Sequence, residues 1–209
     1  MNEKIVYGDI FKAAWKSLMS QIWLLTGLLV GFTIILSLLL LFAIPGKGEA
    51  ISISGILVLV LCLLLGGLIT MGFLRNCMQT LDGEEPQFTA YGQVSHKLFR
   101  FLLAYILFSV MITIGLAFFI FPGVYLFLRF QFFYASMVDE DTGLITSFQR
   151  SWQITKGQTS NLFVLLLIHA LLFTIGLIML GIGIFVAIPL IILMYGYTFR
   201  KLIAPVAQL

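Results

Sequence analysis

The sequence predicts an all-α membrane protein, a bundle of six transmembrane helices paired as three hairpins, each preceded by an amphipathic interfacial helix. Two observations lead to this prediction. Of the 209 residues, 61% are hydrophobic and only 10% are charged, whereas roughly a quarter of the residues in a soluble domain are charged. The apolar residues also gather in segments of about 20 residues, the length that a helix needs to cross a bilayer.

The apolar segments predict one integral membrane domain over residues 1–209, with no room for a separate soluble catalytic domain. Gly181 and Gly183 break the chain between the last two segments. The third and fourth segments meet at Pro122 and Gly123 with almost no loop, which predicts a tight turn. The predicted spans cover residues 22–44, 53–74, 98–121, 122–138, 161–180 and 183–199.

An amphipathic segment precedes each predicted pair of spans. In residues 5–20, apolar side chains recur at three- and four-residue steps with lysines between them, which predicts a helix along the membrane surface. Two shorter segments, around Tyr91 and Phe148, repeat this pattern. Trp15 and Trp152 fall near the predicted interfaces, where amphipathic aromatic rings are favoured.

The placement of positive charges predicts the orientation in the membrane. Of the twelve Lys and Arg residues, Lys47 alone falls in a predicted outer loop and Arg129 alone within a span. The other ten lie on the side of both termini, and cytoplasmic loops are enriched in Lys and Arg, so we expect both termini in the cytoplasm. No basic cluster is present, which argues against nucleic-acid binding.

Arg129 is a charged residue in an otherwise apolar segment, roughly 10 Å below the outer end of its predicted helix. An arginine at that depth costs on the order of 3 kcal/mol on insertion scales, so it should face protein or water. One interpretation is a ligand site, with Tyr125, where the guanidinium binds a phosphate or carboxylate headgroup. The alternatives are a structural clamp on backbone carbonyls, or a side chain that snorkels from a tilted or broken helix.

His169 lies about eight residues inside the fifth predicted span, at a depth comparable to that of Arg129. A neutral histidine there could bond a ligand or relay protons. The alternative is an ordinary hydrogen bond between helices.

Neither a metal, nor a cofactor, nor an enzymatic activity is predicted. The acidic groups 82–85 and 139–141 match no EF-hand spacing, and turns and helix caps explain them. Asp141 or Thr142 is expected to cap the third surface helix. The chain contains no GxSxG, HExxH, Walker A or CxxC motif.

Two motifs carry a family resemblance, FPGVYLFLRF at residues 121–130 and SFQRSWQITKGQ at residues 147–158. The chain resembles a broad group of prokaryotic six-span membrane proteins that includes the YciC-like family and the membrane domain of some glycerophosphoryl diester phosphodiesterases. The resemblance implies an inner-membrane protein without hydrolase activity. The matching residues are Pro122, Gly123, Tyr125, Arg129, Ser151, Trp152, Thr155, Lys156 and Gly157.

These observations together predict a non-enzymatic protein of the cytoplasmic membrane that handles lipid or small amphiphiles in a polar intramembrane pocket with Arg129 and His169. Membrane lipids are the expected partners. One alternative is a transporter or channel subunit. Another is a scaffold, a homo-oligomer or a complex with an accessory membrane protein, because Gly27 and Gly31 have the GxxxG spacing of closely packed helices.

Overall fold

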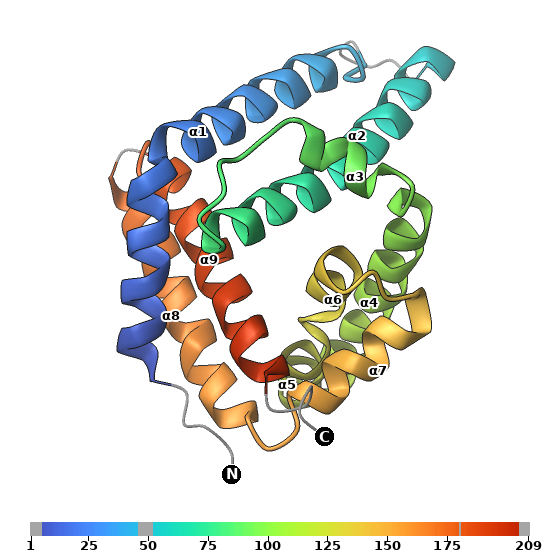
Figure 1. Ribbon diagram of the computed structural model, residues 1–209. Coiled ribbons are helices and arrows are strands. Elements are labelled where there is room, and N and C mark those ends of the chain that lie inside the picture. The colour runs from blue at the N-terminus through green and yellow to red at the C-terminus, as the bar shows by residue number, and fades with distance from the viewer. Residues whose placement is uncertain (1–5, 46–51, 180, 205–209) are drawn as a thin grey trace.

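The computed structural model describes residues 6–45, 52–179 and 181–204, and these residues form helices without any strand. The all-α prediction is therefore confirmed. The helices, shown in Figure 1, are α1 (Tyr7–Leu41), α2 (Ile53–Leu81), α3 (Thr89–Ser95), α4 (Leu98–Phe118), α5 (Ile120–Phe130), α6 (Phe133–Asp139), α7 (Leu144–Ile154), α8 (Thr159–Ile178) and α9 (Ile184–Ile203).

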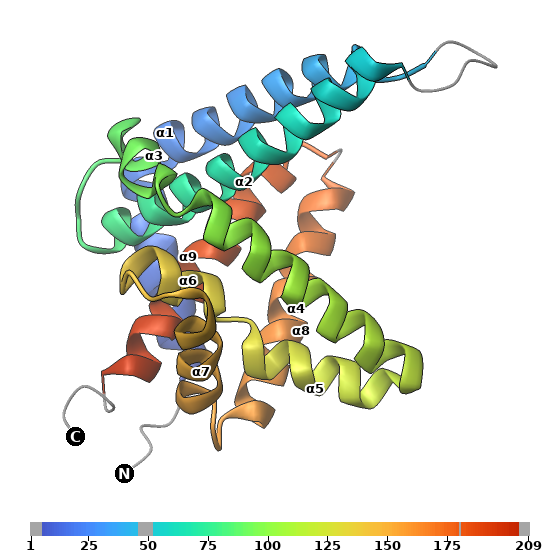
Figure 2. The ribbon, with the colours of Figure 1, turned by 90° about the vertical axis from the view of Figure 1, so that its right-hand side faces the viewer.

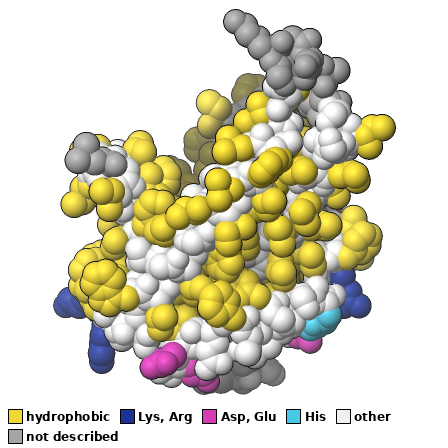
Figure 3. Space-filling view, turned by 90° about the horizontal axis from the view of Figure 1, so that it is seen from above, with side chains coloured by type: hydrophobic (Ala, Val, Ile, Leu, Met, Phe, Trp, Pro, Cys, Tyr) yellow, Lys and Arg dark blue, Asp and Glu magenta, His cyan; other side chains and the backbone are white. Residues whose placement is uncertain are grey.

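Five helices, α1, α2, α4, α8 and α9, are long and apolar enough to cross a membrane. The surface agrees with this composition. Figure 3 shows hydrophobic side chains over most of one face, with charged side chains gathered along a single edge. A surface so apolar would be unstable in water but is suited to lipid. The chain is therefore a multi-pass integral membrane protein.

The three segments predicted as surface helices are all helical in the described residues. The first is continuous with the first predicted span in α1, but the backbone leaves helical geometry at Gln21 (φ −133°, ψ 25°), which kinks α1 at the predicted boundary. The second and third are α3 and α7. Gly72 of α2 permits α3 to pack closely, because a Cβ at Gly72 would lie 2.0 Å from the Tyr91 ring.

The prediction of one helix over residues 122–138 is wrong. Helix α5 ends at Phe130, α6 begins at Phe133, and α5 has only 11 residues. A helix of that length covers roughly 17 Å, about half of a bilayer core. The turn also lies earlier than predicted, at the extended Phe119 (φ −165°, ψ 154°). Pro122 occupies the first turn of α5, where its missing N–H costs nothing.

Small residues bring α4 and α5 together after this turn. A Cβ added at Gly115 would lie 2.9 Å from the Cα atom of Gly123. Gly123, predicted as part of the turn, instead provides a close helix contact. By contrast, Gly27 and Gly31 have no described atom near enough to crowd an added Cβ, so the described fold does not use their GxxxG spacing.

Consecutive long helices pack in pairs, α1 with α2, α4 with α5, and α8 with α9, while α9 also packs against α1 and α2. In Figure 2, α3, α6 and α7 lie on one side of the molecule, and the α1–α2 and α4–α5 pairs diverge from that side. The largest fully buried side chains come mostly from α1, α2 and α9, and include Ile10, Leu18, Met71, Leu74, Leu193 and Phe199.

Ion pairs hold the side that carries α6 and α7. Residues 139–141 end α6, with Glu140 as its C-cap, and all three also form ion pairs. Asp139 pairs with Arg75 (3.4 Å) and Arg200 (3.3 Å), at the ends of α2 and α9. Asp141 pairs with Lys97 (2.8 Å) at the start of α4. Gly143, not Asp141 or Thr142, is the N-cap of α7, and no side chain bonds there. Helices α5 and α6 therefore bring the chain back to the N-terminal end of α4, where Lys97 lies.

Candidate functional site

The break between α5 and α6 is joined to α7 by two buried hydroxyls. Ser151 Oγ donates to the Arg129 carbonyl (2.8 Å) and accepts from the Phe132 N–H (3.1 Å). Thr155 Oγ1 lies 3.1 Å from the same carbonyl, besides 2.7 Å from the Ser151 carbonyl of its own helix. In an uninterrupted helix, α5 itself would supply the partners of these backbone groups. Helix α7 thus provides the hydrogen bonds that the break would otherwise remove.

The Arg129 side chain lies in the same contact between α5 and α7. It is 3% exposed, and its Cζ atom lies 3.9 Å from the centre of the Trp152 ring. Tyr125 meets that ring edge-on at 6.2 Å. Within the described part of the chain, the Arg129 Nε has no hydrogen-bond partner. This is a cation–π contact, in which the negative face of the indole stabilises a guanidinium away from water.

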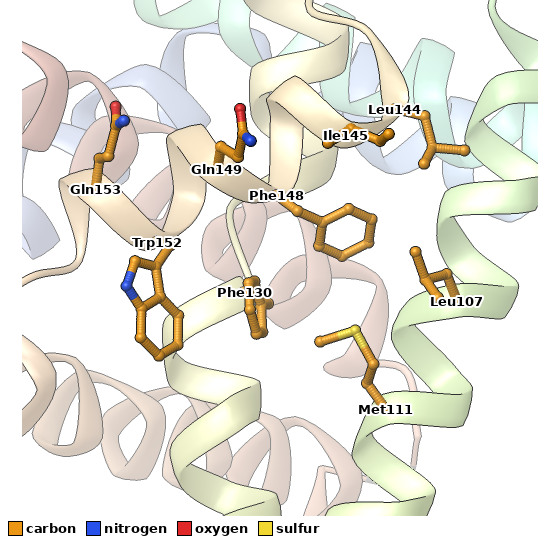
Figure 4. A pocket seen from close by; sticks show the side chains of 9 residues that line it. All are labelled: Leu107, Met111, Phe130, Leu144, Ile145, Phe148, Gln149, Trp152 and Gln153. Carbon is orange, nitrogen blue, oxygen red and sulfur yellow. The ribbon is translucent and has the colours of Figure 1, made fainter.

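An apolar hollow of about 580 Å³ lies beside this contact, between α4, α5 and α7. Figure 4 shows Phe130, Phe148, Trp152 and Met111 around it, while Gln149 and Gln153 point away. Arg129 is not among its lining residues. The hollow is therefore mainly apolar, with Gln149 and Gln153 as its polar lining residues.

His169 lies in a different cavity, of about 340 Å³, which we call the His169 pocket. His169 lines this cavity, and its Nε2 is buried without a hydrogen-bond partner among the described residues. The Tyr195 hydroxyl donates to the Gln131 carbonyl (2.8 Å), and the Tyr134 and Tyr195 rings stack at 4.9 Å. The lining residues are Thr70, Phe101, Tyr105, Phe108, Phe127, Gln131, Phe133, Tyr134, Leu166, His169, Ile191, Ile192 and Tyr195.

The exposure of the lining residues shows where the His169 pocket opens. Phe101, Phe133 and Tyr195 are less than 10% exposed, whereas Tyr105 of α4 is 53% exposed. Thr70 of α2 is also exposed, and the other lining residues come from α4, α5, α6, α8 and α9 and from the break. The pocket therefore opens where Thr70 and Tyr105 are exposed.

The structure separates the candidate residues that the sequence placed in one pocket. Arg129 and Tyr125 belong to the contact with Trp152, and His169 belongs to a pocket that neither of them lines. The two regions meet at Gln131, which lies in the α5–α6 break and also lines the His169 pocket. The hydrogen bonds from Ser151 and Thr155 of α7 to the break, which we call the hydroxyl clamp, thus hold the segment that supplies one wall of the pocket.

Sequence reasoning missed the hydroxyl clamp and the aromatic lining of the pocket. Ser151 and Thr155 stand in the motif that carries the resemblance, but the motif alone gives no partner for them. The run FQFFY at residues 130–134 supplies Gln131, Phe133 and Tyr134 to the pocket. This run places four aromatic residues and one glutamine just before the acidic residues, and that pattern could have indicated the pocket lining.

The remaining sequence candidates have simpler surroundings. Trp15 is 42% exposed and stacks on Phe11 at 6.0 Å, as expected for an interfacial tryptophan. Among the described residues, no three His, Cys, Asp or Glu side chains are placed to hold a metal ion.

Glu140 forms a second link between α6 and α7 at the charged side. It accepts from Arg150 Nη2 (2.8 Å) and from Ser136 Oγ (2.7 Å). Partial burial raises the pKa of Glu140, but these hydrogen bonds and the Arg150 charge outweigh it and lower the pKa below its ordinary value. The hydrogen bond and charge of Lys97 likewise lower the pKa of Asp141.

Protein-family models, curated proteins and solved structures contain no match to this chain. Membership of the YciC-like group therefore stays a prediction from the two sequence motifs.

Proposed function

We propose that this chain is a non-enzymatic protein of the prokaryotic cytoplasmic membrane that binds a lipid or another amphiphile in the His169 pocket. The observation that carries the proposal is His169, which lines an aromatic pocket and whose buried Nε2 has no partner in the described residues. Leaving such an atom unpaired costs about 1–3 kcal/mol. A ligand that bonds it regains that energy, and the opening at Tyr105 gives access from lipid.

The proposed topology is six crossings with both termini in the cytoplasm. Helices α5 and α6 together make the fourth crossing, because Asp141 meets Lys97 at the start of α4. Non-helical backbone at membrane depth is tolerated where protein covers it, as Ser151 and Thr155 do here. In this proposal Arg129 has the structural role, and His169 the ligand-binding role.

Filling the pocket tests the proposal. Leu166 lines the pocket, and its neighbour Leu167 is 53% exposed on the other face of α8. We expect Leu166→Trp to reduce the lipid that co-purifies with the protein, measured by native mass spectrometry, and Leu167→Trp to leave it unchanged. Equal retention by both variants, each with wild-type thermal unfolding, would exclude the pocket as the site.

Transport is the second candidate function, and the α5–α6 break favours it. Discontinuous helices at membrane depth often form the substrate sites of transporters, and Gln131 of the break lines the His169 pocket. If the chain transports its ligand, flux into proteoliposomes should be lost in His169→Ala. Retained lipid without any flux would support binding alone.

A further inference from the structure

The charge of the pocket lining restricts the class of ligand. No Asp, Glu, Lys or Arg is found among the described residues that line the His169 pocket. The buried cation Arg129 lies on Trp152 and is not one of them. A phosphate or carboxylate would therefore give up its hydration without gaining a counter-charge, a cost that neutral hydrogen bonds do not offset.

The polar groups of the pocket suit an uncharged oxygen-bearing head. Thr70, Gln131 and His169 line it beside three tyrosines, but Thr70 donates to its own helix at Gly66 (2.8 Å). A neutral imidazole has one nitrogen that donates and one that accepts. A ligand hydroxyl can therefore pair with the His169 imidazole in either tautomer, and a ligand carbonyl can pair with its donor nitrogen.

We propose that the ligand is a long-chain amphiphile with an uncharged head that carries a hydroxyl or carbonyl group, of the diacylglycerol type, and not a phospholipid. This inference rests on the proposed function. The pocket volume of about 340 Å³ lies near the lower limit of ligand sites. It holds the head and the first carbons, and the chains leave past Tyr105 into the lipid.

Three probes with identical oleoyl chains test the head: dioleoylglycerol, dioleoyl phosphatidate and dioleoyl phosphatidylcholine. Each is added to the purified full chain, and retention is measured by native mass spectrometry. We expect dioleoylglycerol to be retained at least about tenfold more strongly than either phospholipid. Phosphatidylcholine is the stricter control, because aromatic rings attract its quaternary ammonium.

Variants assign the retained lipid to the pocket. His169→Leu and His169→Phe should each lower dioleoylglycerol retention about tenfold, the effect of losing one buried hydrogen bond. The matched control is Thr174→Val on the same helix, whose hydroxyl bonds its own helix at Ala170 (2.8 Å), and its retention should equal that of wild type. If His169→Leu does not fold, His169→Phe still tests the role of the imidazole.

The outcomes separate this inference from the proposed function. In one outcome, phospholipid is retained as strongly as dioleoylglycerol, and its retention falls in the His169 variants. This result would overturn the inference that the ligand head is uncharged, but the pocket would remain a lipid site. Phospholipid that is retained equally in wild type and in the His169 variants is bound at the charged surface. If that is the only lipid retained, both the inference and the proposed function fail.

Discussion

The α5–α6 break and the His169 pocket both bring polar groups into apolar surroundings, but they satisfy those groups differently. At the break, Ser151 bonds both the Arg129 carbonyl and the Phe132 N–H, and the Arg129 guanidinium lies on an indole ring. In the pocket, His169 Nε2 has no partner from the described residues.

This difference distinguishes a structural site from a binding site. At the break, the backbone groups are paired, and the guanidinium lies on the Trp152 ring although its Nε has no hydrogen-bond partner among the described residues. Such a network stabilises one conformation and offers a ligand little. A buried polar atom without a partner lowers stability until something binds it. The two regions should therefore respond to substitution with opposite signs.

The largest effect is expected at the break. Ser151→Ala leaves the Phe132 N–H without its partner and removes one bond to the Arg129 carbonyl, so the free energy of unfolding should fall by about 2 kcal/mol. Denaturant titration of the protein in detergent micelles measures it. Ser109→Ala is the control, because that hydroxyl bonds only its own helix at Tyr105 (2.8 Å). A loss no greater than that of Ser109→Ala would show that α7 does not stabilise the break.

A double-mutant cycle measures the contact between Arg129 and Trp152. We expect a coupling energy of about 1 kcal/mol between Arg129→Met and Trp152→Leu, the strength of a partly desolvated cation–π pair. Trp152→Phe should keep part of the coupling, because it keeps an aromatic face. Additive effects of the two substitutions would mean that the pair contributes no energy beyond packing.

The opposite sign is expected in the pocket. His169→Leu removes a buried atom without a described partner, so the ligand-free protein should gain roughly 0.5–1 kcal/mol in stability. Thermal unfolding of delipidated protein checks the sign, with Thr174→Val as the neutral control. A clear destabilisation would show that His169 makes a structural hydrogen bond in the membrane and is not held for a ligand.

The smallest effect is expected from Glu140, which joins the end of α6 to α7 at a more exposed place than Ser151. Its pKa is lowered in the folded protein, so its contribution to stability is complete above the unfolded pKa and is lost as the pH falls below about 4. Because the pair is partly exposed, the loss should stay below about 0.5 kcal/mol.

Unfolding temperatures of wild type and Glu140→Gln, compared between about pH 6 and pH 3, measure this contribution. Wild type should lose more stability than the variant over that range. A variant that loses stability as steeply as wild type would show that the Glu140–Arg150 pair has no part in the pH dependence.

Hydropathy predicted most of the helices, because a helix in lipid forms all its backbone hydrogen bonds internally. It needs only an apolar segment of sufficient length. The kink at Gln21 and the helix over residues 144–154 also follow from local pattern. The break at residues 131–132 does not, because FQFFY has no proline or glycine. It depends on Ser151, which lies 19 residues from Phe132.

The sequence by itself determined that this protein is helical, that it belongs in a membrane, and that Arg129 is a charge kept from lipid. Only the tertiary structure decided which other polar residues are buried and which of them have partners. Hydrogen bonds and cation–π contacts join helices whose distance in the chain carries no information about their distance in space. Arg129 contacts Trp152 because α5 packs against α7. His169, on α8, faces a pocket that several other helices complete, and its Nε2 has no described partner there.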